Sequence, residues 1–174
     1  MKIIKNKGIL FWITGLPGSG KTSIAKLLKK DIEKKIGPTL ILSGDDIRKM
    51  FNLNSYSHND RKKYVKMYHK ICKNIVNQNI NIIFAVVGLF DFIRKQNRSN
   101  IKNYIEIFMD AKLNKIIKNK KKKRVYMQKK NIVGVDIKVE FPKKPDIIIK
   151  NNFDRGINEM KKELLNKLDK LKLY

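Results

Sequence analysis

The chain has 174 residues, which suits one domain rather than two. Its 41 lysine and arginine residues against 15 acidic residues give a formal net charge of +26, which excludes an acidic solvating chain and points to anionic partners. The hydrophobic fraction of 42% is enough for a packed core. The single cysteine, Cys72, excludes an internal disulfide and a four-cysteine zinc site, so we expect a reducing, cytoplasmic compartment.

The two longest apolar runs, residues 8–16 and 80–90, are shorter than the about 20 residues that a membrane-spanning helix needs. The basic start and the apolar run after it superficially resemble a signal peptide. This run leads straight into a glycine-rich motif, so we expect no cleavage. No membrane partner is therefore expected.

Short apolar runs alternate with longer stretches in which apolar residues recur every three or four positions. Strands are predicted at residues 9–14, 39–42, 81–87, 104–109 and 146–149. Helices are predicted at residues 22–36, 60–78, 90–100, 111–119 and 154–173, with a basic irregular segment at 120–131. This alternation predicts an α/β fold, with a five-stranded parallel sheet covered by helices on both faces. Ligands of such sheets bind at the carboxyl ends of the strands.

A glycine-rich motif follows the first predicted strand and opens the first predicted helix. It fits G-x-x-x-x-G-K-[ST] with Gly15, Leu16, Pro17, Gly18, Ser19, Gly20, Lys21 and Thr22. In this context the backbone N–H groups of the loop and the helix N-terminus surround phosphate oxygens. Lys21 is expected to reach the β- and γ-phosphates of ATP, and Thr22 to bind Mg²⁺ through its hydroxyl. The alternative is a glycine turn with a chance lysine.

Two aspartates follow the second predicted strand, whereas the third strand ends without an acid. Asp45 could hold Mg²⁺ or accept the proton of a substrate hydroxyl. Arg48 lies three residues further along and would share a helix face with Asp45, which suits an acceptor that carries its own phosphate. The alternative is that Asp45 only caps a helix and Arg48 is its exposed partner.

These motifs occur together with Asn59-Asp60-Arg61, a lysine-rich segment and the late pattern G-V-D-x-x-x-E-x-P-x-x-P-D. The set resembles the adenylylsulfate (APS) kinase family over residues 9–151. The glycine-rich loop is common to a whole superfamily, whereas the combination of G-D-x-x-R with the late acidic pattern is much more specific. The resemblance implies a kinase that moves the γ-phosphate of MgATP to the ribose 3′-hydroxyl of a small nucleotide.

The resemblance also implies roles for particular residues. Asp45 matches the family's catalytic aspartate, and Arg48 and Arg61 match two arginines that hold the acceptor. Tyr56 falls near an aromatic residue that stacks on the acceptor base. The other positions expected in the acceptor site are Ile132 and Val133.

The basic segment at residues 120–131 falls on the family's mobile lid, where Arg124 would form a fork on phosphate. The alternative for this segment is a solvated loop in a lysine-rich chain. Residues 140–146 fall on the loop that the family places near the adenine of ATP.

The sequence departs from the family's pattern at several positions on the acceptor side. They are Ser43, Tyr64, Lys66, Asp91 and Ile132, the last in place of a stacking phenylalanine. Asp91 would repel an anionic acceptor if it pointed inward. Loss of one face of an aromatic clamp costs about 0.5–1.5 kcal/mol beyond area burial, and a pyrimidine needs less stacking surface than adenine.

The segments at residues 88–108 and 131–137 resemble a divergent branch of the family, the cytidine diphosphoramidate kinases of capsule-type nucleotide pathways. Cytidine diphosphoramidate is therefore the favoured acceptor, and an authentic adenylylsulfate kinase is the alternative. A nucleic-acid-binding ATPase is a second alternative, because the lysine run could bind polynucleotide. No RNA-binding, helix-turn-helix or zinc pattern accompanies that run, so a nucleic-acid role is not favoured.

Several other residues have two interpretations. Arg94 and Arg98 would share a helix face and either bind substrate or form a solvated pair. The leucine-rich C-terminal helix is expected to pack in the core, with a homodimer face as the alternative. Cys72 is expected in or near the core, and neither histidine has a metal-ligand partner at useful spacing.

Overall fold

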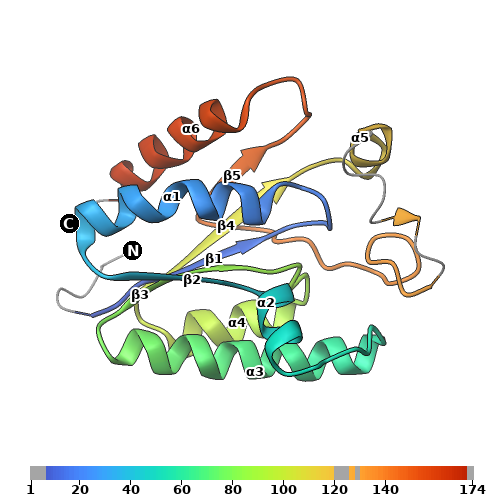
Figure 1. The fold of residues 1–174 in the computed structure, drawn as a ribbon, viewed down its shortest axis with the longest axis horizontal. Coiled ribbons are helices and arrows are strands. Elements are labelled where there is room, and N and C mark those ends of the chain that lie inside the picture. The colour runs from blue at the N-terminus through green and yellow to red at the C-terminus, as the bar shows by residue number, and fades with distance from the viewer. Residues whose placement is uncertain (1–6, 120–125, 128–129, 172–174) are drawn as a thin grey trace.

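The computed structural model describes residues 7–119, 126–127 and 130–171, and its five strands form one parallel sheet (Figure 1). The strands are β1 (Leu10–Thr14), β2 (Thr39–Ser43), β3 (Asn81–Ala85), β4 (Tyr104–Asp110) and β5 (Ile147–Lys150). Their order in the sheet is β2-β3-β1-β4-β5, and every neighbouring pair is parallel. The predicted five-stranded parallel sheet is confirmed.

Within the described residues, six helices connect or follow these strands. They are α1 (Lys21–Ile36), α2 (Gly44–Met50), α3 (His58–Asn77), α4 (Asp91–Asn100), α5 (Leu113–Lys118) and α6 (Ile157–Lys170). In Figure 1, α1 and α6 lie on one face of the sheet and α3 and α4 on the other. No helix in the described ranges is both long and apolar enough to cross a membrane.

Several helix boundaries differ from the prediction by one to three residues, and two of them have clear local reasons. Helix α3 begins at His58 rather than Asp60, because the Ser57 hydroxyl accepts the Asp60 amide hydrogen and so caps the helix. Helix α6 begins at Ile157, after the extended Gly156, rather than at residue 154. The predicted end of this helix at residue 173 lies outside the described residues.

The central strand β1 is buried on both of its faces, so its residues are apolar without alternating with polar ones. Phe11 and Ile13 belong to the core cluster under α1 and α6, whereas Leu10 and Trp12 belong to the cluster under α3 and α4. The leucine-rich side of α6 joins the first cluster through Met160, Leu164 and Leu168. The core-packing interpretation of this helix is confirmed. Cys72 is also buried, in the second cluster.

A third apolar cluster closes the carboxyl ends of the strands. It joins Leu16 after β1, Leu89 after β3, Phe108 on β4, and Val133 and Ile137 from the segment before β5. This cluster ties together the loops that carry the predicted functional residues, so it fixes their relative positions.

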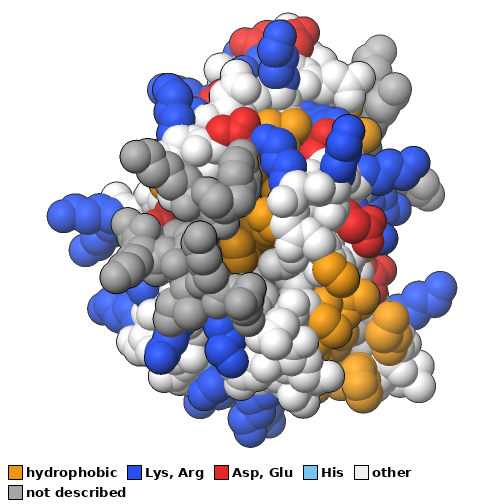
Figure 2. All heavy atoms as spheres, turned by 90° about the vertical axis from the view of Figure 1, so that its left-hand side faces the viewer, with side chains coloured by type: hydrophobic (Ala, Val, Ile, Leu, Met, Phe, Trp, Pro, Cys, Tyr) orange, Lys and Arg blue, Asp and Glu red, His pale blue; other side chains and the backbone are white. Residues whose placement is uncertain are grey.

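Lysine and arginine side chains cover the protein broadly. On the face shown in Figure 2 they lie around the whole outline and are not gathered into one basic patch. This distribution agrees with a lysine excess that is spread along the sequence.

Candidate active site

The glycine-rich loop connects β1 to α1 and curls over the start of the helix. Gly15, Gly18 and Gly20 have φ angles of 151°, 77° and 96°, a region that side chains disfavour. A Cβ on Gly15 would also lie 2.5 Å from the Met109 carbonyl oxygen. The loop therefore depends on glycine at this position, because the neighbouring strand leaves no room for a side chain.

Lys21 is the first residue of α1, and its side chain turns back into the loop. Its Nζ donates to the Leu16 carbonyl oxygen at 2.7 Å, and the residue is buried. No side chain caps α1 among the described residues, and its first turn carries no acid. The N-terminal N–H groups and one ammonium group thus gather at a place suited to phosphate.

Two residues that the sequence analysis missed hold the loop from outside. The buried Asn151 side chain, directly after β5, donates to the Ser19 carbonyl oxygen at 3.0 Å. The Tyr126 hydroxyl donates to the Pro17 carbonyl oxygen at 2.9 Å, and burial raises the pKa of this phenol to about 12. Asn151 was detectable as an uncharged polar residue two positions after a predicted strand, but nothing in the sequence pairs Tyr126 with the loop.

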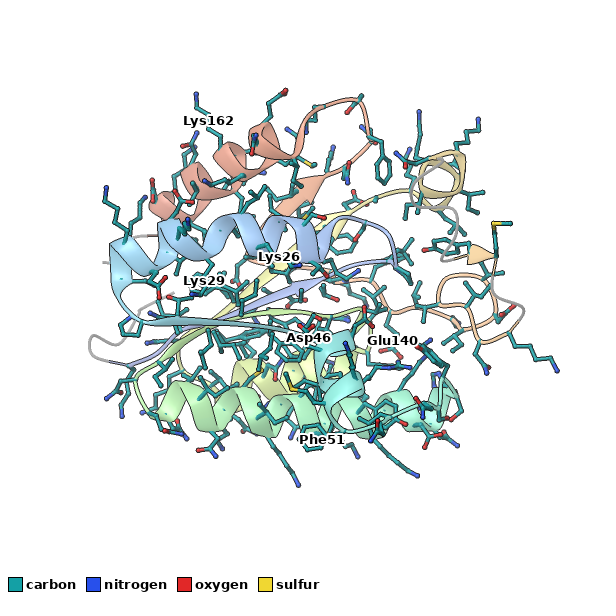
Figure 3. The ribbon with its side chains drawn as sticks, in the orientation of Figure 1. Lys26, Lys29, Asp46, Phe51, Glu140 and Lys162 are labelled. Carbon is teal, nitrogen blue, oxygen red and sulfur yellow. The ribbon has the colours of Figure 1, made fainter. Side chains whose placement is uncertain are left out.

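Helix α2 begins with a reciprocal cap that involves Asp46 and not Asp45. The Ser43 hydroxyl accepts the Asp46 amide hydrogen at 3.1 Å, and the Asp46 carboxylate accepts the Ser43 amide hydrogen at 2.8 Å (Figure 3). The interpretation of Asp45 as a helix cap is therefore wrong. Asp45 is left exposed at the first turn of the helix, on the wall of the cavity described below.

Two arginines and a tyrosine form the opposite part of the site. The Arg48 guanidinium carbon lies 3.6 Å from the centre of the Tyr56 ring, and that of Arg61 lies 5.2 Å from it. Arg61 also donates to the carbonyl oxygens of Tyr56 and Asn131, at 3.0 and 3.2 Å. Burial, followed by the nearby charge of Arg48, lowers the pKa of Arg61. Two neighbouring cations that have lost part of their hydration favour an anionic ligand.

The predicted loop and acceptor residues line one cavity of about 540 Å³, a size suited to a small molecule. The predicted residues on its wall are Pro17, Gly18, Gly20, Lys21, Thr22, Asp45, Arg48, Tyr56, Arg61, Ile132 and Val133. Gly15, Leu16 and Ser19 are not among the lining residues, and Leu16 packs into the third apolar cluster. Arg124, with most of the predicted lid, lies outside the described residues.

The cavity has further walls, of which the sequence analysis named only Tyr64 as a position on the acceptor side. They are Ser23, Gly44, the α3 residues Tyr64, Val65 and Tyr68, the run Ala85–Phe90 at the end of β3, Asn131, and Ile137–Val139. Burial raises the pKa of Tyr68 to about 12, and its hydroxyl donates to the Gly44 carbonyl oxygen at 3.3 Å. The signal that would have found the strand-end run is its place directly after a predicted parallel strand.

Arg94 and Arg98 neither line this cavity nor form a solvated pair. The buried Arg94 pairs with the buried Glu106 at 3.2 Å, and Arg98 pairs with Asp146 at 2.9 Å and Glu106 at 3.4 Å. These ion pairs fix α4 against β4. Asp91 is not a lining residue either; it pairs with Lys95 at 2.7 Å, so the expected repulsion of an acceptor does not arise.

The loop around Lys21, facing one carboxylate and two arginines across a small-molecule cavity at the ends of a parallel sheet, defines a P-loop phosphotransferase. The sequence model of one such family, described as "Adenylylsulphate kinase", matches residues 7–150. The chain belongs to this family, and it is a kinase that uses a hydroxyl group as acceptor.

Curated relatives cover almost the whole chain. The "Cytidine diphosphoramidate kinase" of Campylobacter jejuni is 29% identical over 169 residues, which are 95% of this chain and 99% of the relative. The "Adenylyl-sulfate kinase" of Thermodesulfovibrio yellowstonii is 31% identical over 177 residues, which cover 97% and 88% of the two chains. The kinase prediction is confirmed.

Solved structures agree with this assignment. The Mycobacterium tuberculosis APS kinase CysC in complex with AMPPNP and APS superimposes with a TM-score of 0.77 at 25% identity, covering 94% of this chain and 98% of that one. A shikimate kinase from Aquifex aeolicus, with a TM-score of 0.58 at 18% identity, shares the fold.

Proposed function

We propose that this kinase transfers the γ-phosphate of ATP to the ribose 3′-hydroxyl of cytidine diphosphoramidate. The observation that carries the choice of acceptor is Ile132, an aliphatic residue on the cavity wall at the position where the family resemblance places a stacking phenylalanine. A pyrimidine loses less than adenine when one aromatic face is replaced by an aliphatic side chain. The similarity to the C. jejuni relative, named for this acceptor, supports the choice.

The residues of the cavity divide between the two substrates. Lys21 and the N–H groups at the start of α1 would bind the ATP phosphates, and Arg48 and Arg61 would hold the phosphates of the acceptor. Asp45, exposed on the wall between them, would orient the 3′-hydroxyl and accept its proton as the new P–O bond forms. In-line transfer then needs little beyond this positioning and charge neutralisation.

The residues fit Mg²⁺ held mainly by substrate phosphates. The Thr22 hydroxyl and the Asp45 carboxylate line the same cavity and are hard oxygen donors. No group of three or more His, Cys, Asp or Glu that could hold a metal occurs within the described ranges. Magnesium in kinases takes one or two protein oxygens, with water and phosphate as its other ligands, and bound Mg²⁺ neutralises charge on the β- and γ-phosphates.

Phosphorylation of adenylylsulfate is the second candidate function. Tyr56 on the cavity wall supports it, because an aromatic ring offers adenine a stacking surface. The T. yellowstonii relative reported above is named as an adenylyl-sulfate kinase, which also supports this candidate. A homodimer and a cytoplasmic location stay predictions.

The deciding experiment measures ADP release from MgATP with a panel of acceptors. The panel contains cytidine diphosphoramidate, adenylylsulfate, plain nucleoside diphosphates and no acceptor. Turnover with the cytidine compound alone supports the proposal. Turnover with adenylylsulfate alone overturns it in favour of the second candidate, and no turnover with either compound would mean that the acceptor is a different nucleotide.

A further inference from the structure

Three acidic residues of the segment before β5 share one structural task. The carboxylate of Asp136 accepts the Ile132 amide hydrogen at 2.9 Å, that of Glu140 accepts the Asp91 amide hydrogen, and that of Asp146 accepts the Glu106 amide hydrogen at 2.8 Å. In a chain with only 15 acidic residues, these three anchor the backbone at successive points. Asp136 thus closes a local turn, whereas Glu140 and Asp146 attach this segment to the rest of the fold.

Glu140 makes the attachment nearest to the cavity, and it uses both its backbone and its side chain. Its backbone N–H donates to the Leu89 carbonyl oxygen at 3.0 Å, while its carboxylate accepts from Asp91 at the first turn of α4. The N-cap residue of this helix, Phe90, supplies no side-chain cap. A carboxylate from a segment 49 residues further along the chain thus takes the place of a local cap, where the helix dipole also favours negative charge.

The two segments that Glu140 joins are both walls of the cavity. Leu89 and Phe90 line it directly before α4, and Ile137–Val139 line it directly before Glu140. Glu140, which is labelled in Figure 3, is itself not a lining residue. Glu140 can therefore affect a ligand only by setting the distance and angle between these two walls.

We propose that Glu140 is a positioning residue for the acceptor: it holds the Leu89–Phe90 wall against the Ile137–Val139 wall and so sets the shape of the apolar part of the cavity. That the ligand in this part of the cavity is the acceptor rests on the proposed function. The ATP phosphates are expected at the loop around Lys21, which this attachment does not touch. The family resemblance places the adenine of ATP near residues 140–146, whereas the Leu89–Phe90 and Ile137–Val139 walls are assigned here to the acceptor instead. The two substrates should therefore respond differently to the loss of Glu140.

The test compares Glu140→Ala and Glu140→Gln with Glu33→Ala. Glutamine keeps an oxygen that can accept the Asp91 amide hydrogen. Glu33 is an exposed residue of α1 whose side chain pairs only with Lys29 in the described structure, so its loss gives the same charge change without removing a backbone anchor. Two readouts are needed: steady-state kinetics with the acceptor that the panel identifies, and hydrogen exchange of the Asp91 amide with no substrate present.

We expect Glu140→Ala to raise KM for the acceptor at least about fivefold, the factor that corresponds to losing a typical helix cap. KM for ATP and kcat should stay within about twofold, and the Asp91 amide should exchange faster. Glu140→Gln should restore both readouts, and Glu33→Ala should match the unaltered protein.

Two results would overturn the proposal. An unchanged acceptor KM in Glu140→Ala would show that the attachment does not shape the acceptor site, and equal increases in both KM values would show a general structural effect. Failure of the proposed function is distinguishable, because it appears as an inactive acceptor panel. In that case the hydrogen-exchange rates at residues 88–91 and 137–139 decide between the outcomes. Unchanged rates in Glu140→Ala overturn the proposal. Faster exchange in both segments, with normal exchange in the loop at residues 15–22, supports it.

Discussion

Asp45 and Asp46 are adjacent carboxylates with different tasks, because α2 begins at the residue before them. Asp46 stands at the third helical position, where its carboxylate reaches back to the Ser43 amide and closes the cap. Asp45 stands one position earlier, exposed on the cavity wall, on the face that Arg48 shares three residues later. Because Asp46 closes the cap, the Asp45 carboxylate is left available to a ligand in the cavity.

Replacing Asp45 with asparagine should lower kcat about 10²- to 10⁴-fold, the range for loss of a positioned general base. The affinity for ATP should remain within a few-fold, since the loop around Lys21 is untouched. Single-turnover kinetics and titration with a fluorescent ATP analogue would measure the two effects. Turnover within a few-fold of the unaltered enzyme would refute the role given to Asp45.

Replacing Ile132 with phenylalanine restores an aromatic side chain on the cavity wall. Stacking worth about 0.5–1.5 kcal/mol should lower KM for adenylylsulfate about two- to tenfold. It should not improve the cytidine acceptor by the same factor. Competition between the two acceptors in one assay would measure the ratio, and Val135→Phe, an exposed residue of the same turn that is not a lining residue, serves as the control.

At the scale of elements, α4 is fastened to β4 by charge at a position where helices usually rely on apolar packing. Arg94 and Glu106 are both buried, with exposed side-chain fractions of 5% and 6%. Burial raises the pKa of Glu106, and the charges of Arg94 and then Arg98 lower it. The carboxylate therefore depends on its cations to stay ionised at this depth.

Replacing Arg94 with methionine should destabilise the fold by about 3–5 kcal/mol at pH 7, because it leaves Glu106 buried with only the half-exposed Arg98. Because the pKa of Glu106 is raised in the folded state, the folded protein binds the proton of this carboxyl group more tightly than the unfolded protein does. The destabilisation should therefore shrink as the pH falls through that pKa. Urea unfolding at pH 7 and pH 5 would test this, and a penalty independent of pH would contradict it.

Asn151 connects the end of β5 to the phosphate loop, so the outer part of the sheet supports ATP binding. Replacing it with alanine removes the hydrogen bond to the Ser19 carbonyl, worth about 1 kcal/mol. KM for ATP should rise about fivefold while KM for the acceptor is unchanged. Asn152→Ala, at the exposed neighbouring position, should change neither value.

At the scale of the whole molecule, the two core clusters on the two faces of the sheet support different parts of the site. The cluster under α1 and α6 supports the helix that follows the glycine-rich loop, and the cluster under α3 and α4 includes the cavity-lining residues Val65 and Tyr68. The carbonyl oxygens of Ile148 and Lys150 on the edge strand β5 accept from Lys167 and Arg155, which blocks addition of a further strand there. The lysine excess thus includes residues with a defined structural use.

Replacing Leu164 with alanine should lower the free energy of unfolding by about 2–5 kcal/mol, because its side chain is fully buried between α6 and the sheet. Chemical unfolding followed by circular dichroism would measure the loss. Below the unfolding transition, kcat should be unchanged, since Leu164 is not a lining residue of the cavity. A selective loss of kcat without loss of stability would contradict this division.

The sequence by itself determined the alternation of strands and helices, the phosphate loop and the family. These features are encoded locally: apolar periodicity, glycine positions and short motifs depend on residues within one or two turns of each other. The position of Asp45 and Arg48 near the loop also followed from strand ends meeting at one edge of a parallel sheet, whereas that of Arg61 followed from the family resemblance.

Only the tertiary structure decided which of several equivalent-looking charges serve the site. Arg94 and Arg98 carry the same signal in the sequence as Arg48 and Arg61, yet their partners Glu106 and Asp146 bind them to the fold. Asn151 and Glu140 acquire their roles from residues 132 and 49 positions away. Such pairings depend on how strands and helices pack, and the local sequence around each residue does not indicate its distant partner.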